Sequence, residues 1–150
     1  MPRRVANGID FGRLLLIVAV LSRRASLRLG NQDIVVNVTG GLKINEPAAD
    51  LGIALSIASS FSDNEIDPKL AVIGELGLSG ELRAVSQLER RLNEVARLGF
   101  QRCLVPKSGL KNIKAPVSLT LVPAGTIKEA IARGLVKRHR DKQLAEPEEY

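Results

Sequence analysis

The segment Gly41–Ser60, GLKINEPAADLGIALSIASS, constrains the fold of this chain more than any other. Glycines precede it, Pro47 follows a polar stretch, and small and apolar residues then continue to Phe61. Since Asn45 can cap a helix and proline is tolerated in a first turn, the pattern predicts a helix that begins near residues 45–47. A loop that opens such a helix often presents a nucleophile. The first turn here offers two alanines and Asp50 instead, with no serine, threonine or cysteine.

Helical and strand patterns alternate along the rest of the chain. Asp10 is a good N-cap for the apolar run that ends at Leu21, and the β-branched residues Ile34–Val38 predict the firmest strand. The predicted order is helix (11–21), hairpin (26–38), helix (47–61), hairpin (70–85), helix (87–98), strand (101–106), strand (117–123) and helix (126–136). This order predicts an α/β (α+β) domain of two layers with a mixed sheet.

The expected domain boundaries are residues 1–135 for a single folded domain and residues 136–150 for a charged tail. The tail ends in RHRDKQLAEPEEY, a composition typical of a disordered chain end.

Composition excludes several classes of protein. The chain of 150 residues has one cysteine, Cys103, and one histidine, His139, so neither an internal disulfide nor a tetrahedral metal site of its own is expected. We interpret Cys103 as a small core residue on a strand and His139 as part of the tail. No apolar run reaches the ~18 residues that span a bilayer, and no phosphate-loop pattern is present. A cytoplasmic location without membrane contact is the expectation.

Positive charge is concentrated at the N-terminal end. The net charge is +6, and residues 1–30 alone hold six arginines against one aspartate, Asp10. Arginine clusters suit phosphate oxygens, although a solubilising face would carry the same charge. The chain has four aromatic residues, of which Phe11, Phe61 and Phe100 are expected in the core and Tyr150 ends the chain. Without aromatic platforms for single strands, backbone contact to a duplex is the better hypothesis for nucleic-acid binding.

Three blocks of sequence, in order, resemble a known family. They are RRVANGIDFGRLLLIVAVLSRRASLRLGNQD, GGLKINEPAADLGIALSIASS and GELGLSGELRAVSQLERRLNEVARLGF. Together they resemble the C-terminal domain of the bacterial DNA-repair family RadA, also called Sms. That domain is similar to the proteolytic domain of Lon, with a ribosomal-protein-domain-like fold. The resemblance covers nearly all of residues 3–135. It implies that the family's zinc finger and ATPase core, with their zinc, ATP and Mg²⁺, lie upstream of these residues, and it implies no cofactor in this chain.

Both members of the Lon serine–lysine dyad are acids in this sequence. Alignment on Gly52 places Asp50 at the serine position, and counting from the Gly-Glu pair at Gly74 places Glu89 at the lysine position. The dyad needs a hydroxyl and a neutral amine to take its proton, so the resemblance implies a loop that keeps its shape without its reaction. We interpret Asp50 as a first-turn acid that the helix dipole stabilises, in a surface ion pair, with Arg90 or Arg91 balancing both acids.

The expected function is therefore non-catalytic. The resemblance implies a hexameric ring motor that acts on recombination intermediates, works with the RecA recombinase and promotes branch migration on double-stranded or branched DNA. Within that ring, a Lon-like domain would assist assembly and hold duplex DNA. The predicted phosphate contacts are Arg23, Arg24, Arg28 and Lys43, because they flank the first hairpin and the Gly-Gly loop. Arg3, Arg4 and Arg13 are weaker candidates.

Two alternative functions remain open from the sequence. One is a peptidase of altered mechanism, for which the available side chains are Ser56, Ser59, Ser60, Ser79, Ser86, Lys43 and Lys69. The other is a protein-interaction scaffold without DNA contact, in which the arginines belong to an interface or a solvated surface.

Overall fold

The N-terminal part of the fold is a strand, a helix and a second strand. The computed structural model describes residues 1–137. Strand β1 (Arg4–Asn7) is followed by helix α1 (Phe11–Arg24) and strand β2 (Ile34–Asn37). The two strands pair in parallel, Arg4 opposite Ile34. Parallel pairing needs a crossover, which α1 provides. The Asp10 side chain accepts a hydrogen bond from the Arg13 N–H, so the predicted N-cap is confirmed.

The hairpin predicted over residues 26–38 is wrong. Its second strand exists as β2, but residues 26–33 form no strand, and β2 pairs with β1 instead. The Arg4 guanidinium donates hydrogen bonds to the carbonyls of Leu29 (2.9 Å) and Gln32. These bonds hold the turn after α1 against the sheet, so the turn residues connect a helix to a strand rather than two strands to each other.

Helix α2 (Asp50–Ser62) begins later than predicted. Two short 3₁₀ segments precede it, η1 (Thr39–Gly41) and η2 (Pro47–Ala49). Asn45 is not the cap, because η2 follows Glu46 and has no side-chain cap, and Ala49 precedes α2. Asp50 is therefore the first residue of the α-helix.

The rest of the chain builds three further small sheets and two more helices. The hairpin predicted over residues 70–85 is confirmed only in its central part: β5 (Glu75–Leu76) and β6 (Leu82–Arg83) pair antiparallel, Leu76 opposite Leu82, whereas residues 70–72 form a separate strand that pairs in parallel with residues 102–104. Thr126 caps the last helix, since its side chain accepts a hydrogen bond from the Glu129 N–H. The remaining elements are β3 (Glu65–Ile66), β4 (Leu70–Val72), β5 (Glu75–Leu76), β6 (Leu82–Arg83), α3 (Leu88–Arg97), β7 (Arg102–Pro106), β8 (Thr120–Ala124), α4 (Ile127–Gly134) and β9 (Leu135–Val136).

A mixed α/β architecture is thus confirmed, but the strands form small separate sheets. Within residues 1–137, β4, β7 and β8 form a parallel sheet, β1 and β2 form a parallel pair, and β3–β9 and β5–β6 are antiparallel pairs. The helix predicted over residues 126–136 ends at Gly134, and its last two residues form strand β9, which includes Val136, a residue that the sequence also assigned to the tail. Residues 138–150, the rest of that predicted tail, with His139 and Tyr150, lie outside the described residues.

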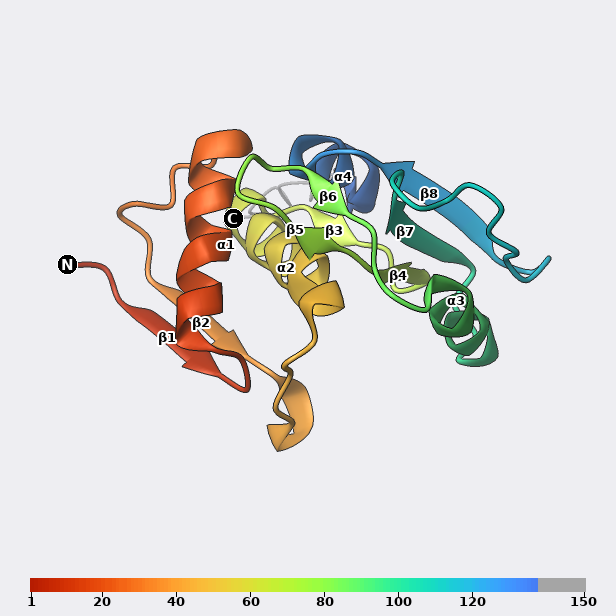
Figure 1. Cartoon of the computed structure of the whole chain (residues 1–150). Helices are drawn as coiled ribbons and strands as arrows, with labels where there is room; N and C mark the ends of the chain where they lie inside the picture. Colours follow the sequence, from red (N-terminus) through yellow and green to blue (C-terminus); the bar gives the residue numbers. More distant parts are fainter. Residues whose placement is uncertain (138–150) are drawn as a thin grey trace, which may run out of the picture.

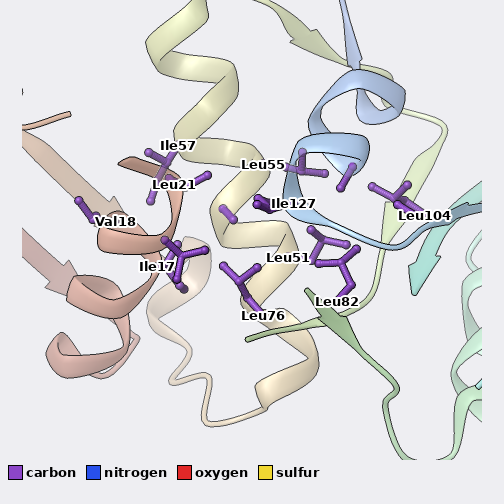
Figure 2. Packing of buried hydrophobic residues seen from close by; sticks show 14 of the residues in the cluster. Ile17, Val18, Leu21, Leu51, Leu55, Ile57, Leu76, Leu82, Leu104 and Ile127 are labelled. Atoms are coloured by element: carbon purple, nitrogen blue, oxygen red, sulfur yellow. The ribbon is translucent and has the colours of Figure 1, made fainter. Parts of the chain in front are cut away.

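Helix α2 is the centre of the main core. It lies between the β1–α1–β2 unit and the sheet of β4, β7 and β8 (Figure 1). Leu51 and Leu55 are fully buried, and residues of α1, the β5–β6 hairpin, β7 and α4 converge on them (Figure 2). A residue's position on α2 therefore decides whether it faces core or solvent.

A smaller core lies under α3, where Leu88 and Leu92 pack with the buried Cys103 of β7. The interpretation of Cys103 as a core residue is confirmed. The expectation for the phenylalanines is wrong for two of three, because Phe11 and Phe61 are 50% and 40% exposed. Among residues 1–137, no helix is both long and apolar enough to cross a membrane.

Candidate functional site

Asp50, which the sequence predicted at the Lon serine position, is the one buried charged residue within residues 1–137, with 2% of its surface exposed. Its Oδ1 accepts a hydrogen bond from Arg13 Nε at 2.8 Å, and its Oδ2 accepts one from a terminal nitrogen of the same guanidinium. The backbone N–H of Leu76 also donates to Oδ2, at 3.1 Å. One carboxylate therefore connects α1, α2 and β5.

The position of Asp50 follows from its neighbours on α2. Ala49 accompanies it at the start of the helix, and Leu51, Ala54 and Leu55 immediately after it are fully buried. A carboxylate carried into such surroundings must be paired and hydrogen-bonded, because an isolated buried charge is strongly unfavourable. Arg13 meets this need from the first turn of α1.

Arg13 is the residue that sequence reasoning missed at this site. Its side chain is 32% exposed, and its hydrogen bond and charge interaction with Asp50 raise its pKa, while partial burial opposes that shift. The prediction of a surface ion pair with Arg90 or Arg91 is wrong: Arg91 pairs with Glu46 at 2.6 Å, and Arg90 contacts the Gln87 amide oxygen at 3.4 Å. A signal was available, since Asp50 and Arg13 each open a long apolar helix.

Glu89, which the sequence predicted at the Lon lysine position, has a different environment. It lies in the first turn of α3, is exposed, and accepts a hydrogen bond from the Lys114 backbone N–H at 3.1 Å. The polar contacts of Asp50 are Arg13 and Leu76, so no hydrogen bond connects the two acids. Asp50 and Glu89 therefore do not form an acid–base pair in the structure.

Two of the candidate serines on α2, Ser56 and Ser59, donate hydrogen bonds to backbone oxygens. The Ser56 hydroxyl donates to the Gly52 carbonyl at 2.8 Å, and the Ser59 hydroxyl donates to the Asn64 carbonyl at 2.5 Å. Bonds of the first kind are ordinary for serine on a helix and leave the hydroxyl without an activating base. Within residues 1–137, no three or more His, Cys, Asp or Glu side chains gather as a possible metal site.

The arginines of residues 1–30 divide into two groups. Arg3, Arg4 and Arg13 are engaged within the fold, with Asp33, with backbone carbonyls and with Asp50 respectively. Arg23, Arg24 and Arg28 are exposed and form no side-chain hydrogen bond or ion pair within the described part of the chain. These three are therefore available to an external anion.

Lys43 does not lie with those three arginines. The loop that carries it returns to the start of α1, where the Ile44 N–H donates to the Gly8 carbonyl at 2.7 Å. Arg23 and Arg24 occupy the last turn of α1, at its other end (Figure 1). At 1.5 Å per residue, the helix separates the two places by roughly 20 Å. The four predicted phosphate contacts thus comprise three arginines close in sequence, at the end of α1 and in the turn after it (the arginine cluster), and one distant lysine.

A groove of about 740 Å³ lies between β2 and the outer face of α2, and sequence reasoning did not anticipate it. Ile34 to Val38 line one side, and Gly52, Ser56 and Phe61 are among the residues of the other side. A second hollow of about 480 Å³ lies between η2 and α3. Ala49 and Val72 line both, so the two hollows adjoin there.

The chain matches one protein-family model and is similar to several curated proteins that share one name. The family model described as "Subunit ChlI of Mg-chelatase" matches residues 17–109. The chain is 46% identical over 130 residues to the DNA repair protein RadA of Halalkalibacterium halodurans, covering 87% of this chain and 28% of that protein. It is 45% identical over 134 residues to RadA of Bacillus subtilis, covering 89% and 29%. It is 44% identical over 131 residues to RadA of Streptococcus pneumoniae, covering 87% and 31%. The chain thus spans less than a third of the length of these relatives.

Proposed function

Because this chain belongs to the ChlI family and is homologous to part of the bacterial DNA repair protein RadA, we propose that it is the non-catalytic, Lon-like module of a RadA-type protein. Its proposed task is to hold duplex or branched DNA while the whole protein, a hexameric cytoplasmic ring that cooperates with RecA, processes recombination intermediates. ATP, Mg²⁺ and zinc would belong to the rest of that protein.

The observation that carries the DNA-binding part is the uncommitted cluster of Arg23, Arg24 and Arg28. Arginines that the fold uses are paired in the structure, whereas these three leave their guanidinium groups to solvent at one end of α1. Guanidinium groups pair with phosphate oxygens two at a time, and phosphate contacts dominate affinity for duplex DNA. Lys43, about one α1 length away, would contact a separate phosphate of the same duplex.

The non-catalytic part of the proposal is supported by Asp50. Both of its oxygens accept hydrogen bonds from donors that the fold supplies, and Arg13 balances its charge. A carboxylate whose two oxygens are both engaged in this way is poorly placed to attack a substrate. The position that corresponds to the Lon serine is better suited to fixing α1, α2 and β5 in place.

A charge-reversal pair tests the DNA-binding proposal. We expect the double variant Arg23→Glu, Arg24→Glu to bind a labelled duplex at least about tenfold more weakly at low salt. The plot of log affinity against log salt concentration should become shallower by about 2, one unit for each lost contact. Fluorescence anisotropy with the 150-residue chain at several salt concentrations measures both quantities.

The matched control is Lys111→Glu, Lys128→Glu, which changes the net charge equally at two exposed lysines outside the cluster. It should weaken binding much less. Equal losses in both double variants would show that overall charge, rather than this cluster, attracts DNA, and would contradict the proposed site.

A further inference from the structure

Strand β2 has one edge without a partner strand. Its inner edge faces β1, because Ile34 N–H donates to the Arg3 carbonyl and Val38 N–H donates to the Asn7 carbonyl, each at 2.9 Å. Backbone groups alternate along a parallel strand, so the N–H and C=O of Val35 and Asn37 point to the opposite edge. Within residues 1–137, β2 pairs only with β1.

This open edge is the wall of the groove between β2 and α2. Every residue from Gln32 to Val38 lines it, so the groove follows the strand over its whole length. On the α2 side, Gly52 and Ser56 leave room: a Cβ added at Gly52 would meet no atom within 4 Å. The space beside the unpaired backbone is therefore suited to one extended polypeptide segment, added as a further strand.

The charge of the groove excludes nucleic acid as the occupant. Its one charged lining residue is Asp33, which already accepts a hydrogen bond from the Arg3 N–H at 2.7 Å. The uncommitted arginines at the end of α1 are not among the lining residues. Binding to a phosphate backbone requires cations, which this groove does not present.

The adjoining hollow holds charges of both signs. Arg90 and Arg91 of α3 line it together with Glu46 and Glu94, and it begins where the groove ends, at Ala49 and Val72. Glu46 pairs with Arg91 and Glu94 pairs with Arg97, whereas the side-chain hydrogen bond of Arg90 within the described residues is the 3.4 Å bond to Gln87. Arg90 is therefore the guanidinium of this hollow that has no carboxylate partner there. An acidic side chain or a terminal carboxylate that follows the apolar segment would meet the Arg90 guanidinium.

We propose that the groove between β2 and α2 binds an extended segment of a partner protein, uncharged along β2 and acidic at the end that lies against Arg90. The segment adds to the open edge of β2 through main-chain hydrogen bonds to Val35 and Asn37. Small and apolar side chains of the segment lie on the α2 face. This proposal is independent of DNA binding, since the groove and the arginine cluster share no residue.

A designed peptide tests the proposal. The probe is fluorescein-labelled Thr-Val-Thr-Val-Thr-Val-Asp-Asp with a free C-terminus, and fluorescence anisotropy with the 150-residue chain measures its binding. We expect saturable binding with a Kd below about 1 mM. Ser56→Trp, which fills the groove from an exposed position, should weaken binding at least about tenfold.

Two further variants separate backbone recognition from charge. Val35→Pro removes the N–H that faces the groove while leaving the β1 bonds at Ile34 and Val38, and should abolish binding; Val35→Thr is the control and should bind normally. The wild type should bind the Asp-Asp probe more tightly than a version that ends in Lys-Lys. Arg90→Glu should bind the Lys-Lys version more tightly instead. If Val35→Pro unfolds the chain, Ser56→Trp decides alone.

Several results would overturn the proposal. One is that the probe does not bind the wild type at about 1 mM, and another is that it binds the wild type and Ser56→Trp equally well. Competition by duplex DNA would assign the groove to nucleic acid. A dimer in light scattering that Ser56→Trp dissociates would assign it to a second copy of this chain, and binding seen only after removal of residues 138–150 would assign it to the chain's own end. Duplex affinity of Ser56→Trp should stay at the wild-type value, which distinguishes failure here from failure of the DNA-binding proposal.

Discussion

Asp50 and Glu89 occupy similar places in two helices but have different roles. Each is an acid in a first helical turn, where the helix dipole favours negative charge by about 0.3–1 kcal/mol. Asp50 is buried and receives three hydrogen bonds from Arg13 and Leu76, whereas Glu89 is exposed and receives one from Lys114. The comparison shows that burial and partners, rather than position in the helix, decide what an acid contributes.

The difference extends to the cores beneath the two helices. Helix α2 is at the centre of the main hydrophobic cluster, and α3 covers the smaller cluster that contains Cys103. If α3 and the smaller core beneath it unfolded locally, the difference between Asp50 and Glu89 would reflect that local unfolding as much as their difference in burial. Five predictions test or refine this comparison.

The largest expected effect is on the reactivity of Cys103. Burial raises the pKa of its thiol from 9.0 to about 12. Since the thiolate is the reactive form, the native thiol should react with a disulfide reagent at pH 8 about 1000-fold more slowly than the urea-unfolded thiol. Absorbance of the released thiol measures both rates. Native rates within about tenfold of the unfolded rate would mean that α3 opens readily.

The raised pKa of Cys103 also makes the stability of the fold depend on pH in the alkaline range. The folded thiol keeps its proton up to about pH 12, whereas the unfolded thiol loses it near 9.0. The contribution to stability is therefore complete below about pH 8.5 and is lost as the pH rises towards 12. Replacing Cys103 by alanine should remove this part of the alkaline loss.

The next largest effect is expected for Arg13→Ala. It leaves the Asp50 carboxylate buried without its countercharge, so we expect the free energy of unfolding to fall by about 3 kcal/mol. The partial exposure of Arg13 keeps the loss at the lower end of the range for buried pairs. Urea denaturation measures it. Arg91→Ala is the control, because it removes a more exposed ion pair and should cost under about 1 kcal/mol.

A smaller loss, about 1.5 kcal/mol, is expected for Asp50→Asn. The asparagine oxygen can still accept from the Leu76 N–H, but the charge that holds Arg13 is gone. A double-mutant cycle with Arg13→Ala should show a coupling of at least about 1 kcal/mol. Additive losses would indicate that Asp50 is stabilised mainly by the backbone rather than by Arg13.

The smallest effect is expected for Glu89→Gln. The amide oxygen can replace the carboxylate as acceptor for the Lys114 N–H, and the position is exposed, so stability should change by no more than about 0.5 kcal/mol. The urea midpoint of this variant against the wild type is the measurement. A loss comparable to that of Asp50→Asn would remove the distinction between the two helices.

Local signals in the sequence were read correctly where one short segment determines the structure. The Asp10 cap and the β5–β6 part of the predicted hairpin each depend on residues within a few positions of one another. The pairing of β1 with β2 was missed because it joins residues 30 positions apart, and β1 has only four residues. A hairpin was the nearest local alternative for the same strand pattern.

The candidate site likewise has features that local motifs in the sequence indicated and features that depend on distant residues. The acids at positions 50 and 89 were found by motif spacing, but the partner of Asp50 lies 37 positions away on another helix. The sequence predicted a surface ion pair with Arg90 or Arg91, and no residue near Asp50 in the sequence indicated that it would be buried and paired with Arg13 instead. The groove beside β2 could not be predicted either, since it depends on which strand edge stays unpaired.

The three-way attachment of Asp50 also limits how a serine could be placed at this position. Asp50→Ser alone would leave the Arg13 guanidinium beside the core without its carboxylate, and the shorter side chain would reach less far towards the Leu76 N–H. An arginine left in that place would repel the cationic form of any lysine introduced as a base. A serine–lysine pair at this site would therefore need α1 to change together with α2.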